Sequence, residues 1–544
     1  MPIKITVRCK TVTPMLASGA NQQEFEIRAS EIKYGLRFWW RAFQSFSTIE
    51  ELYKNEIDLF GGASSDNTGR ASSFKLFINN INGLQFWNPG TQTNWGDGIN
   101  YIFFSIVDRQ GMIKPPIDPK DPKKSGRKVA KPGANFTIHI NFHQRNNERF
   151  GDVLCSLWLF VNMGGIGGRT RRGAGSFEIT ELKIDDKIID KCRNDSNYKE
   201  LFNKGIPSFE ISNDQSPAEF IRDGVNIIFR RWNTNAIRTK PVTYTAFDPN
   251  TSDILVLYDA IARNSNSAMD IMNIIGAKIG NYCDTYPYDE ACSMHKTLST
   301  QVNSFPSDFF LNKVSKGLPI VYNFKEEFGN IRGQNLNAKY IATTALWDDK
   351  TDQPKKEKGD IKEGGRRSSP LIISCHKKGD KSYAVICFLP APIISNNEKF
   401  WLKSIPNKPE LDVFFNSSDK PPFAPFINEM LYDKKTFKDR KGDEQIKSPI
   451  TSAFKKIYKI HPYKEIVNPT DPPQRPAQQV AKLKISNWLS RANSIKKEDS
   501  FIIKQIIQEI NKLFSDDKEQ ESEELKNTLE KKLNELGIRK LYKF

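Results

Sequence analysis

The chain has 544 residues, 81 of them Lys or Arg and 64 Asp or Glu, so its formal net charge is +17 at pH 7. This excess favours a polyanionic partner, although ribosomal or membrane-surface proteins could share it and it does not report on fold. The length exceeds one ordinary core and suggests about three to four domains. No apolar run approaches the roughly 20 residues that cross a bilayer, so no membrane span is expected.

Secretion and disulfide stapling are not expected. Residues 1–10 alternate apolar and polar side chains and lack the apolar core of a signal peptide. The seven cysteines are odd in number and scattered, which argues against a disulfide framework and for a reducing compartment. We therefore expect a protein of a reducing compartment.

The first 182 residues are expected to form an α+β domain. Ile3–Val12 alternates with the period of a half-buried strand. One helix is expected from Ser30 to about Gln44, and a second, apolar nearly all round, at Asp152–Met163. Further strands are expected at Ser73–Ile78, Tyr101–Val107, Phe136–Phe142 and Ser176–Leu182. The order strand, helix, strand, strand, helix, strand predicts a ferredoxin-like (RRM-like) domain over residues 1–182.

A second, more diverged ferredoxin-like domain is expected over residues 207–468. Ser216 and Glu219 have the spacing of a capping box, which predicts a helix that ends at Trp232. The remaining elements expected here are a strand, a helix, a further strand, a polar insertion and a hairpin, at Ile254–Tyr258, Ser267–Tyr282, Leu318–Phe324, Asp348–Gly365 and Leu371–Leu389. After a Pro-rich stretch, residues 477–544 are expected to form a helical C-terminal extension.

Two motifs carry the functional signal. At about 100° per residue, Lys33, Arg37 and Arg41 share one stripe of the first helix, with Trp40 at its edge and Trp39 in the core. The second motif, Gly164–Gly175, is too glycine-rich to pack as core, and it carries three arginines.

Glycine lets backbone N–H groups approach phosphate oxygens, and guanidinium groups add bidentate donors. Cations beside aromatic surfaces are what single-stranded RNA recognition requires, although a tight turn with its arginines in water is the alternative for the loop. The candidate RNA-binding residues are Lys33, Arg37, Trp40, Arg41, Gly167, Gly168, Arg169, Arg171, Arg172, Gly173 and Gly175.

The insertion between the middle strands, residues 108–135, is the most basic segment of this domain. From residue 108 to 131 it holds eight Lys or Arg, three Asp and several prolines. Such a composition does not pack as a core. A mobile basic arm is expected, either as a solvated loop or as a direct RNA contact.

Other chemistries receive little support from the residues. The glycine-rich loop leaves a helix and enters a strand, the reverse of a P-loop, and it lacks the Lys-Ser/Thr pair. Five histidines are present and none precedes His139, so acid–base catalysis is poorly supported and no catalytic residue is assigned. Cys283, Cys292 and His295 lack a paired Cys-x-x-Cys and a fourth ligand, so neither a metal nor another cofactor is expected.

Several segments resemble the RAMP superfamily, and more narrowly the first subunit of the Cmr module of type III-B CRISPR effector complexes. These segments are Thr13–Ala20, Ile32–Ala42, Leu59–Gly61 and Gly164–Gly175. Arg366–Leu371 is similar to a motif in that subunit's second domain. The resemblance covers residues 1–182 closely and 207–390 loosely, and it leaves out the basic insertion and the tail.

The resemblance implies two ferredoxin-like domains in a cytoplasmic ribonucleoprotein for antiviral defence. The partners would be guide RNA, target RNA and the other Cmr effector subunits. The subunit would bind near the 3′ end of the guide RNA and assist target capture without catalysis, since in this family its neighbours carry cleavage. Two alternatives stay open: a RAMP-type endoribonuclease that processes guide RNA or cleaves target RNA, and an assembly scaffold whose charge offsets RNA held by other subunits.

Overall fold

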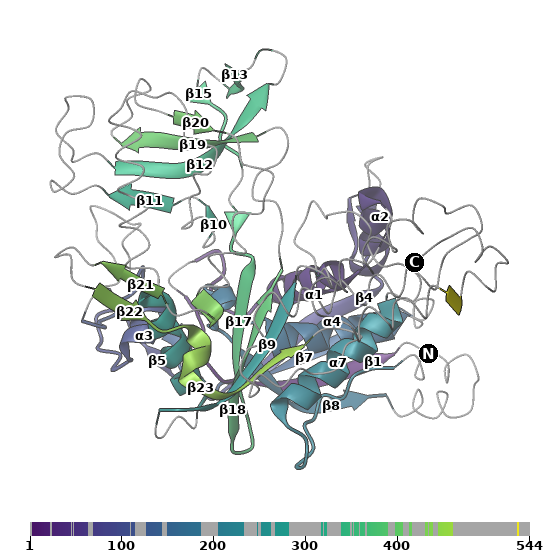
Figure 1. The fold of residues 1–544 in the computed structure, drawn as a ribbon. Helices are drawn as coiled ribbons and strands as arrows, with labels where there is room; N and C mark the ends of the chain where they lie inside the picture. The colour runs from purple at the N-terminus through teal and green to yellow at the C-terminus, as the bar shows by residue number, and fades with distance from the viewer. Residues whose placement is uncertain are drawn as a thin grey trace, which may run out of the picture. The chain divides into compact units, whose positions relative to one another are not determined.

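The computed structural model (Figure 1) divides into one unit over residues 1–467 and a second over residues 468–544. The described residues are 3–185 apart from 22–23, 45, 47, 64–68, 109, 115–126 and 144–148; 205–232, 247, 252–262 and 267–281; the strands between 317 and 460 with short connections; and 530–531. Residues 109 and 115–126 of the basic insertion, the cluster of Cys283, Cys292 and His295, and nearly all of the predicted C-terminal helices lie outside these residues.

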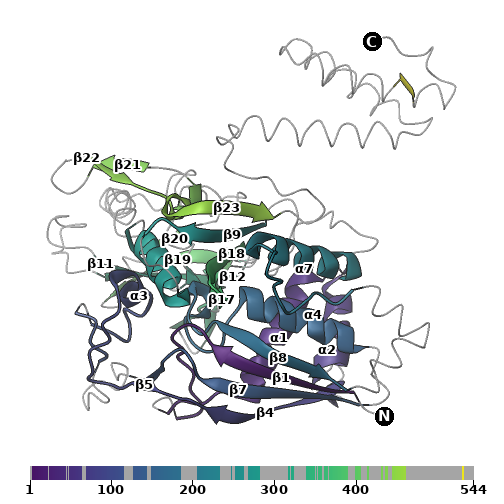
Figure 2. The same cartoon turned by 90° about the horizontal axis from the view of Figure 1, so that it is seen from below.

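The first sheet has four antiparallel strands in the order β4-β7-β1-β8. In chain order these strands are β1 (Lys4–Thr11), β4 (Phe74–Asn82), β7 (Asn135–Phe142) and β8 (Phe177–Ile184). Helices α1 (Ala29–Phe43) and α4 (Phe150–Met163) follow the first and third strands and lie side by side against one face of the sheet (Figure 2). The sheet thus has the strand order of a split βαβ unit, and its predicted element order is confirmed.

One predicted strand in this part of the chain is wrong. Tyr101–Val107 is not a strand: α3 (Asp97–Ile102) and a turn occupy this stretch. Here Ile99, Ile102 and Ile106 recur at helical spacing and pack in a second core cluster with the helix over residues 268–281. The sequence pattern was ambiguous because an apolar run of this length suits either a strand or a helix.

Helix α2 (Ile49–Phe60) was not predicted. The Thr48 side chain caps it by accepting a hydrogen bond from the Glu51 N–H, with 3.1 Å between the two atoms. The helix packs against α1 and covers part of the surface that the sequence analysis assigned to RNA.

The second sheet has the same strand order as the first. It contains β9 (Asp253–Ala260), β17 (Leu371–Lys378), β18 (Lys381–Phe388) and β23 (Phe454–Ile460), arranged β17-β18-β9-β23. Helix α7 (Pro217–Trp232) precedes β9, and the helix over residues 268–281 follows it. The predicted hairpin and the capping box are both confirmed. The chain is therefore a mixed α+β protein with two separate antiparallel four-stranded sheets.

A third sheet was not predicted. It is formed by β11 (Ile320–Asn323), β12 (Lys339–Asp348), β19 (Glu398–Ile405) and β20 (Val413–Phe415), with β13 (Gln353–Pro354) paired to β12. The predicted strand Leu318–Phe324 belongs to it in part.

The remaining described strands form two-stranded pairs: β2 (Gly62–Ala63) with β3 (Gly69–Arg70), β5 (Phe86–Trp87) with β6 (Val129–Ala130), β10 (Gly317–Leu318) with β16 (Arg367–Ser368), β14 (Lys356–Glu357) with β15 (Asp360–Ile361), and β21 (Lys435–Lys438) with β22 (Glu444–Lys447).

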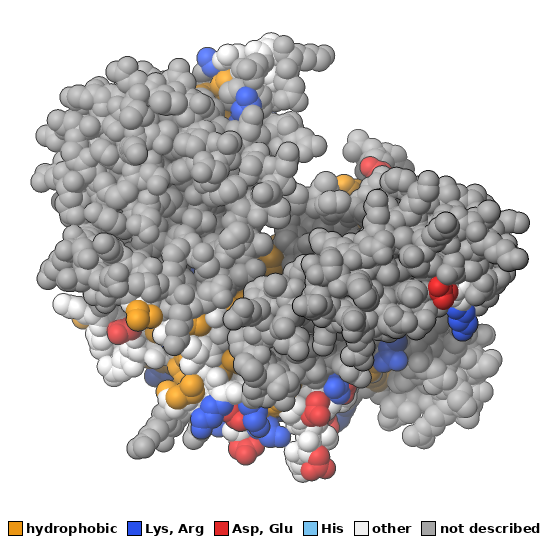
Figure 3. Space-filling model, in the orientation of Figure 1, with side chains coloured by type: hydrophobic (Ala, Val, Ile, Leu, Met, Phe, Trp, Pro, Cys, Tyr) orange, Lys and Arg blue, Asp and Glu red, His pale blue; other side chains and the backbone are white. Residues whose placement is uncertain are grey.

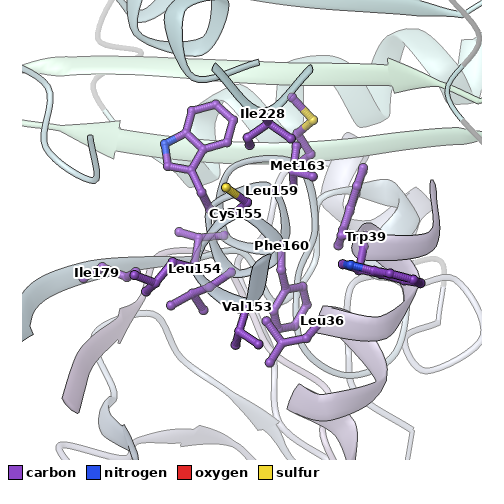
Figure 4. Packing of buried hydrophobic residues seen from close by; sticks show 14 of the residues in the cluster. Leu36, Trp39, Val153, Leu154, Cys155, Leu159, Phe160, Met163, Ile179 and Ile228 are labelled. Atoms are coloured by element: carbon purple, nitrogen blue, oxygen red, sulfur yellow. The ribbon is translucent and has the colours of Figure 1, made fainter. Parts of the chain in front are cut away.

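Helix α4 is the centre of the main core (Figure 4). Every residue of α4 except Asp152 is buried, as its apolar character predicted. One side packs against α1 and β8, and another against β17 and β18 of the second sheet. Trp158 contacts Phe220 of α7, with ring centroids 5.6 Å apart. A helix with apolar neighbours on both sides holds the two sheets in one core.

No helix in the described part of the chain is both long and apolar enough to cross a membrane.

The contact between α1 and α4 depends on a glycine. A Cβ at Gly35 would lie 2.4 Å from a ring carbon of Phe160, which is 2% exposed and has little room to move. We expect Gly35→Ala to lower the free energy of unfolding by about 1–3 kcal/mol through overpacking, although alanine is the better helix former.

Urea unfolding followed by circular dichroism measures this effect. Gly69→Ala is the control, because nothing lies within 4 Å of a Cβ at that position. A Gly35→Ala variant as stable as the parent chain would show that the two helices can separate without cost.

Candidate nucleic-acid interface

The Gly/Arg loop, Gly164–Gly175, is docked on the segment that follows β1. The Thr13 hydroxyl donates a hydrogen bond to the Gly173 carbonyl and accepts one from the Ser176 N–H, both at 2.8 Å. The Gly168 N–H donates to the Leu16 carbonyl at 2.7 Å. The loop motif and the segment at Thr13 are thus brought together by backbone contacts.

The loop is packed, which corrects the expectation that it is too glycine-rich to do so. Gly167 has a φ of +96°, and a Cβ there would lie 2.3 Å from the Leu16 carbonyl oxygen. Gly175 has a φ of +69°, and a Cβ there would lie 1.8 Å from the Ile166 carbonyl oxygen. Glycine is therefore required at both positions by close approach as well as by conformation.

Arg171 joins the loop to both domains. Its guanidinium group lies over the Phe38 ring of α1, 5.2 Å from the centroid, and donates a hydrogen bond to the Ser369 carbonyl just before β17. Burial lowers the pKa of Arg171, while the neighbouring Tyr34 acts in the opposite sense. Arg171 therefore belongs to the seam between the two sheets.

Arg169 is also engaged with the protein. It has a φ of +65°, its guanidinium group lies 5.3 Å from the Phe104 ring centroid, and it donates to the Ser105 hydroxyl. Burial lowers the pKa of Arg169, and the positive charge of Arg172 lowers it further. Arg172 is partly exposed beside it.

Two cations of α1 contact a buried carboxylate that the sequence analysis missed. Glu56 of α2 is 3% exposed and lies 2.9 Å from Nε of Arg37 and 3.3 Å from Nη1 of Arg41. The two arginine side chains remain 31% and 35% exposed. Lys33 Nζ lies 5.6 Å from the Phe74 ring centroid, and burial followed by the Arg37 charge lowers the pKa of Lys33. Because the two arginines share one carboxylate, part of their positive charge is neutralised internally.

Trp40 is not available for stacking, contrary to the sequence analysis. Its side chain is 1% exposed, and its ring centroid lies 6.0 Å from those of Phe46 and Phe60. The physical reason is α2, which ends at Phe60 and covers the edge of α1 that would otherwise face water. Trp40 belongs to the core together with Trp39, which is 2% exposed as expected.

The exposed aromatic residue of α1 is Tyr34, which the sequence analysis did not select. Its side chain is 66% exposed. Arg171 of the Gly/Arg loop lies near it. The sequence did contain a signal for this exposure, because Tyr34 lies outside the apolar stripe of the helix that contains Leu36 and Trp39.

The described charged side chains on one face of the molecule are of both signs. On the face shown in Figure 3, several of the described Lys and Arg side chains lie beside Asp and Glu along the lower edge, others lie apart from these near the top, and they do not form one basic patch. The candidate interface is made up of the partly exposed cations Lys33, Arg37 and Arg41 of α1, Arg172 of the Gly/Arg loop, and the exposed Tyr34.

The described residues contain no group of three His, Cys, Asp or Glu side chains that could hold a metal ion.

A buried histidine holds the seam next to the loop. His376 Nε2 donates to the Asn162 carbonyl oxygen of α4 at 2.9 Å, and the Ser374 hydroxyl donates to the same oxygen at 2.7 Å. Burial lowers the pKa of His376 from 6.5 to about 4. The folded chain therefore keeps this ring neutral at pH values where an unfolded chain protonates it.

This predicts a loss of stability in acid. Between pH 6.5 and about 4 the unfolded state binds a proton that the folded state does not, so the free energy of unfolding should fall as the pH drops, by up to about 3 kcal/mol. Urea titrations at several pH values measure the slope. His376→Gln keeps an N–H donor and does not titrate. Over the same pH range its free energy of unfolding should therefore fall by about 3 kcal/mol less than that of the parent chain. Equal slopes in the two chains would contradict the assignment.

Comparisons with known proteins agree with these motifs. A family model described as the RAMP superfamily matches residues 8–178. Among curated proteins, the CRISPR system Cmr subunit Cmr1-2 of Pyrococcus furiosus is 28% identical over 180 residues, which are 32% of this chain and 94% of that protein. The residues matched by the family model include α1, α4 and the Gly/Arg loop.

Two solved structures show weaker likeness. The apo crystal structure of Cmr1 from Pyrococcus furiosus gives a TM-score of 0.41 at 15% identity, covering 72% of this chain and 89% of that one. A cryo-EM structure of the Type III-B Cmr-beta bound to cognate target RNA gives a TM-score of 0.34 at 15% identity, covering 72% of this chain and 94% of that one. At these scores the superpositions say nothing further about the site.

Proposed function

This chain is a RAMP superfamily protein similar to the first subunit of the Cmr complex, and we propose that it is an RNA-binding subunit of a type III-B CRISPR effector ribonucleoprotein. Its two four-stranded sheets would then be two ferredoxin-like RAMP domains. The partners would be guide RNA, target RNA and other Cmr subunits in the cytoplasm. Within that complex the subunit would bind near the 3′ end of the guide RNA and assist target capture.

One observation carries the proposal: α1 and the Gly/Arg loop present cations and an exposed aromatic ring in one place. Arg171 lies against Phe38 of α1 and near Tyr34, and the same helix carries Lys33 and Arg37. Lysine and arginine attract the phosphates, and an exposed ring offers a surface to a base. The ion pair with Glu56 fixes the direction of the Arg37 guanidinium group, and it neutralises part of the positive charge of this surface.

We expect the α1 arginines to contribute to the salt dependence of RNA binding. Arg37→Ala and Arg41→Ala are made in a Glu56→Gln background, because removing both arginines would leave the buried carboxylate without a counter-charge. Relative to Glu56→Gln alone, the slope of log K against log salt should fall by about 0.7 for each phosphate that the arginines neutralise.

Fluorescence anisotropy with a short single-stranded RNA at several salt concentrations measures the slope. The control, Lys356→Ala with Lys362→Ala, removes two exposed cations at the β14–β15 hairpin and should leave the slope unchanged. An unchanged slope in the α1 variant would exclude this helix from the interface.

Tyr34 is expected to stack on a base. Tyr34→Ala should weaken single-stranded RNA binding by about 5- to 100-fold, the range for removal of one stacked base, and Tyr34→Phe should retain binding. Tyr53→Ala removes another exposed aromatic ring, 47% exposed on α2, and serves as the control. If Tyr34→Ala and Tyr53→Ala bind RNA equally well, Tyr34 makes no contribution.

The same preparations test the ribonuclease alternative. The proposal of a non-catalytic subunit expects repeat RNA and guide–target duplex to be recovered intact after incubation with the purified chain, with or without Mg²⁺. Cleavage that disappears in a His139→Ala variant would favour a RAMP-type endoribonuclease instead.

A further inference from the structure

The face of the first sheet opposite α1 and α4 has its own arrangement of side chains (Figure 2). Alternate residues of each strand point to opposite faces, so Ile5, Val7 and Ile138 enter the core while their neighbours face outward. Across the sheet, Phe77 of β4 pairs with His139 of β7, and His139 pairs with Thr6 of β1.

An aromatic pair lies on this outer face, across the edge strand β4 and its neighbour β7. The rings of Phe77 and His139 are stacked, with centroids 4.6 Å apart and an interplanar angle of 15°. His139 Nε2 lies 2.9 Å from the Asn79 Oδ1, and Nδ1 lies 3.4 Å from the Thr6 hydroxyl. Phe77 is nevertheless 44% exposed. The pair is therefore ordered before any ligand arrives, and binding would cost little additional side-chain entropy.

Cations and amides surround the pair. On one side the cross-strand row contains Lys75, Asn141 and Lys4. On the other side Arg8 is 61% exposed, and Lys183, in the same row as Thr6, is 64% exposed. Both of these cations contact Glu181, at 2.7 Å each, so the carboxylate neutralises part of their charge. The face has more basic than acidic groups and carries polar groups able to hydrogen-bond a base edge.

We propose that this outer face is a second contact surface for single-stranded RNA, with one nucleobase stacked on Phe77. The inference rests on the proposed RNA-binding function and adds a site on the other side of the sheet from α1. A four-stranded sheet whose exposed aromatic residues stack bases is an established way of binding single-stranded RNA. Lys75, Lys4 and Arg8 would contact the phosphates on either side of the stacked base.

A protein partner fits this face less well. Protein–protein interfaces are depleted of lysine in their centres, whereas here lysines lie on both sides of the aromatic pair. The exposed large apolar side chains of β4 are Phe77 and Ile81, the latter 40% exposed. This is a small apolar area for a specific protein interface.

The test uses the full chain and two short single-stranded RNAs, one intact and one with abasic sites. Phe77→Leu keeps an apolar side chain and removes the aromatic ring. It should weaken binding of the intact RNA by about 5- to 100-fold. Binding of the abasic RNA, which has no bases to stack, should be the same for Phe77→Leu and the parent chain. Ile81→Ala, on the same strand, should bind both RNAs as the parent chain does, and thermal melting should show all variants folded.

Three outcomes overturn the proposal. Phe77→Leu that binds intact RNA as well as the parent chain excludes stacking on this face. Equal weakening on intact and abasic RNA assigns the effect to something other than a base. Retained RNA binding with loss of complex assembly in both Phe77→Leu and Ile81→Ala would assign the face to a protein partner. A parent chain that binds no RNA would overturn both this inference and the proposed function. If instead the Tyr34 or Arg37/Arg41 variants weaken RNA binding while Phe77→Leu does not, only the present inference is overturned.

Discussion

The burial of α4 on every side is the constraint that organises both sheets. The helix fills the space between α1 with the first sheet and β17 with β18 of the second, so neither sheet has a complete core without it. The Gly/Arg loop begins where α4 ends, and it therefore emerges at the seam between the two sheets. The loop glycines accept close backbone contacts there, and Arg171 crosses the seam to Ser369.

This location limits how the basic residues can be used. A guanidinium group at a seam loses hydration, and it needs partners within the protein to offset that loss. Arg169 and Arg171 find aromatic rings and oxygen acceptors, and Arg37 and Arg41 share Glu56. Such contacts hold the cations in fixed directions while reducing the charge presented to a polyanion. The proposed interface would thus orient an RNA strand more than attract it from a distance, whereas the overall charge of +17 favours that attraction.

The two surfaces proposed to bind RNA are on opposite sides of the first sheet, and its edge strand β4 lies between them. Lys33 of α1 reaches the Phe74 ring of β4 on the helical side, and Phe77 of the same strand faces the outer side. A single strand that contacts both surfaces would pass around this edge. The order β4-β7-β1-β8 leaves β4 at the border of the sheet.

Periodicity and spacing along the chain were sufficient to predict β1, β7, α1, α4, the β17–β18 hairpin and the capping box at Ser216, because each of these depends on neighbours in the sequence. Exposure depends instead on contacts between elements. Trp40 and Tyr34 could not be ranked from helical spacing, because an unpredicted helix, α2, covers one and leaves the other in water. Likewise, the pairing of Glu56 with two arginines and the stacking of Phe77 on His139 join residues from different elements, and local periodicity holds no information about such contacts.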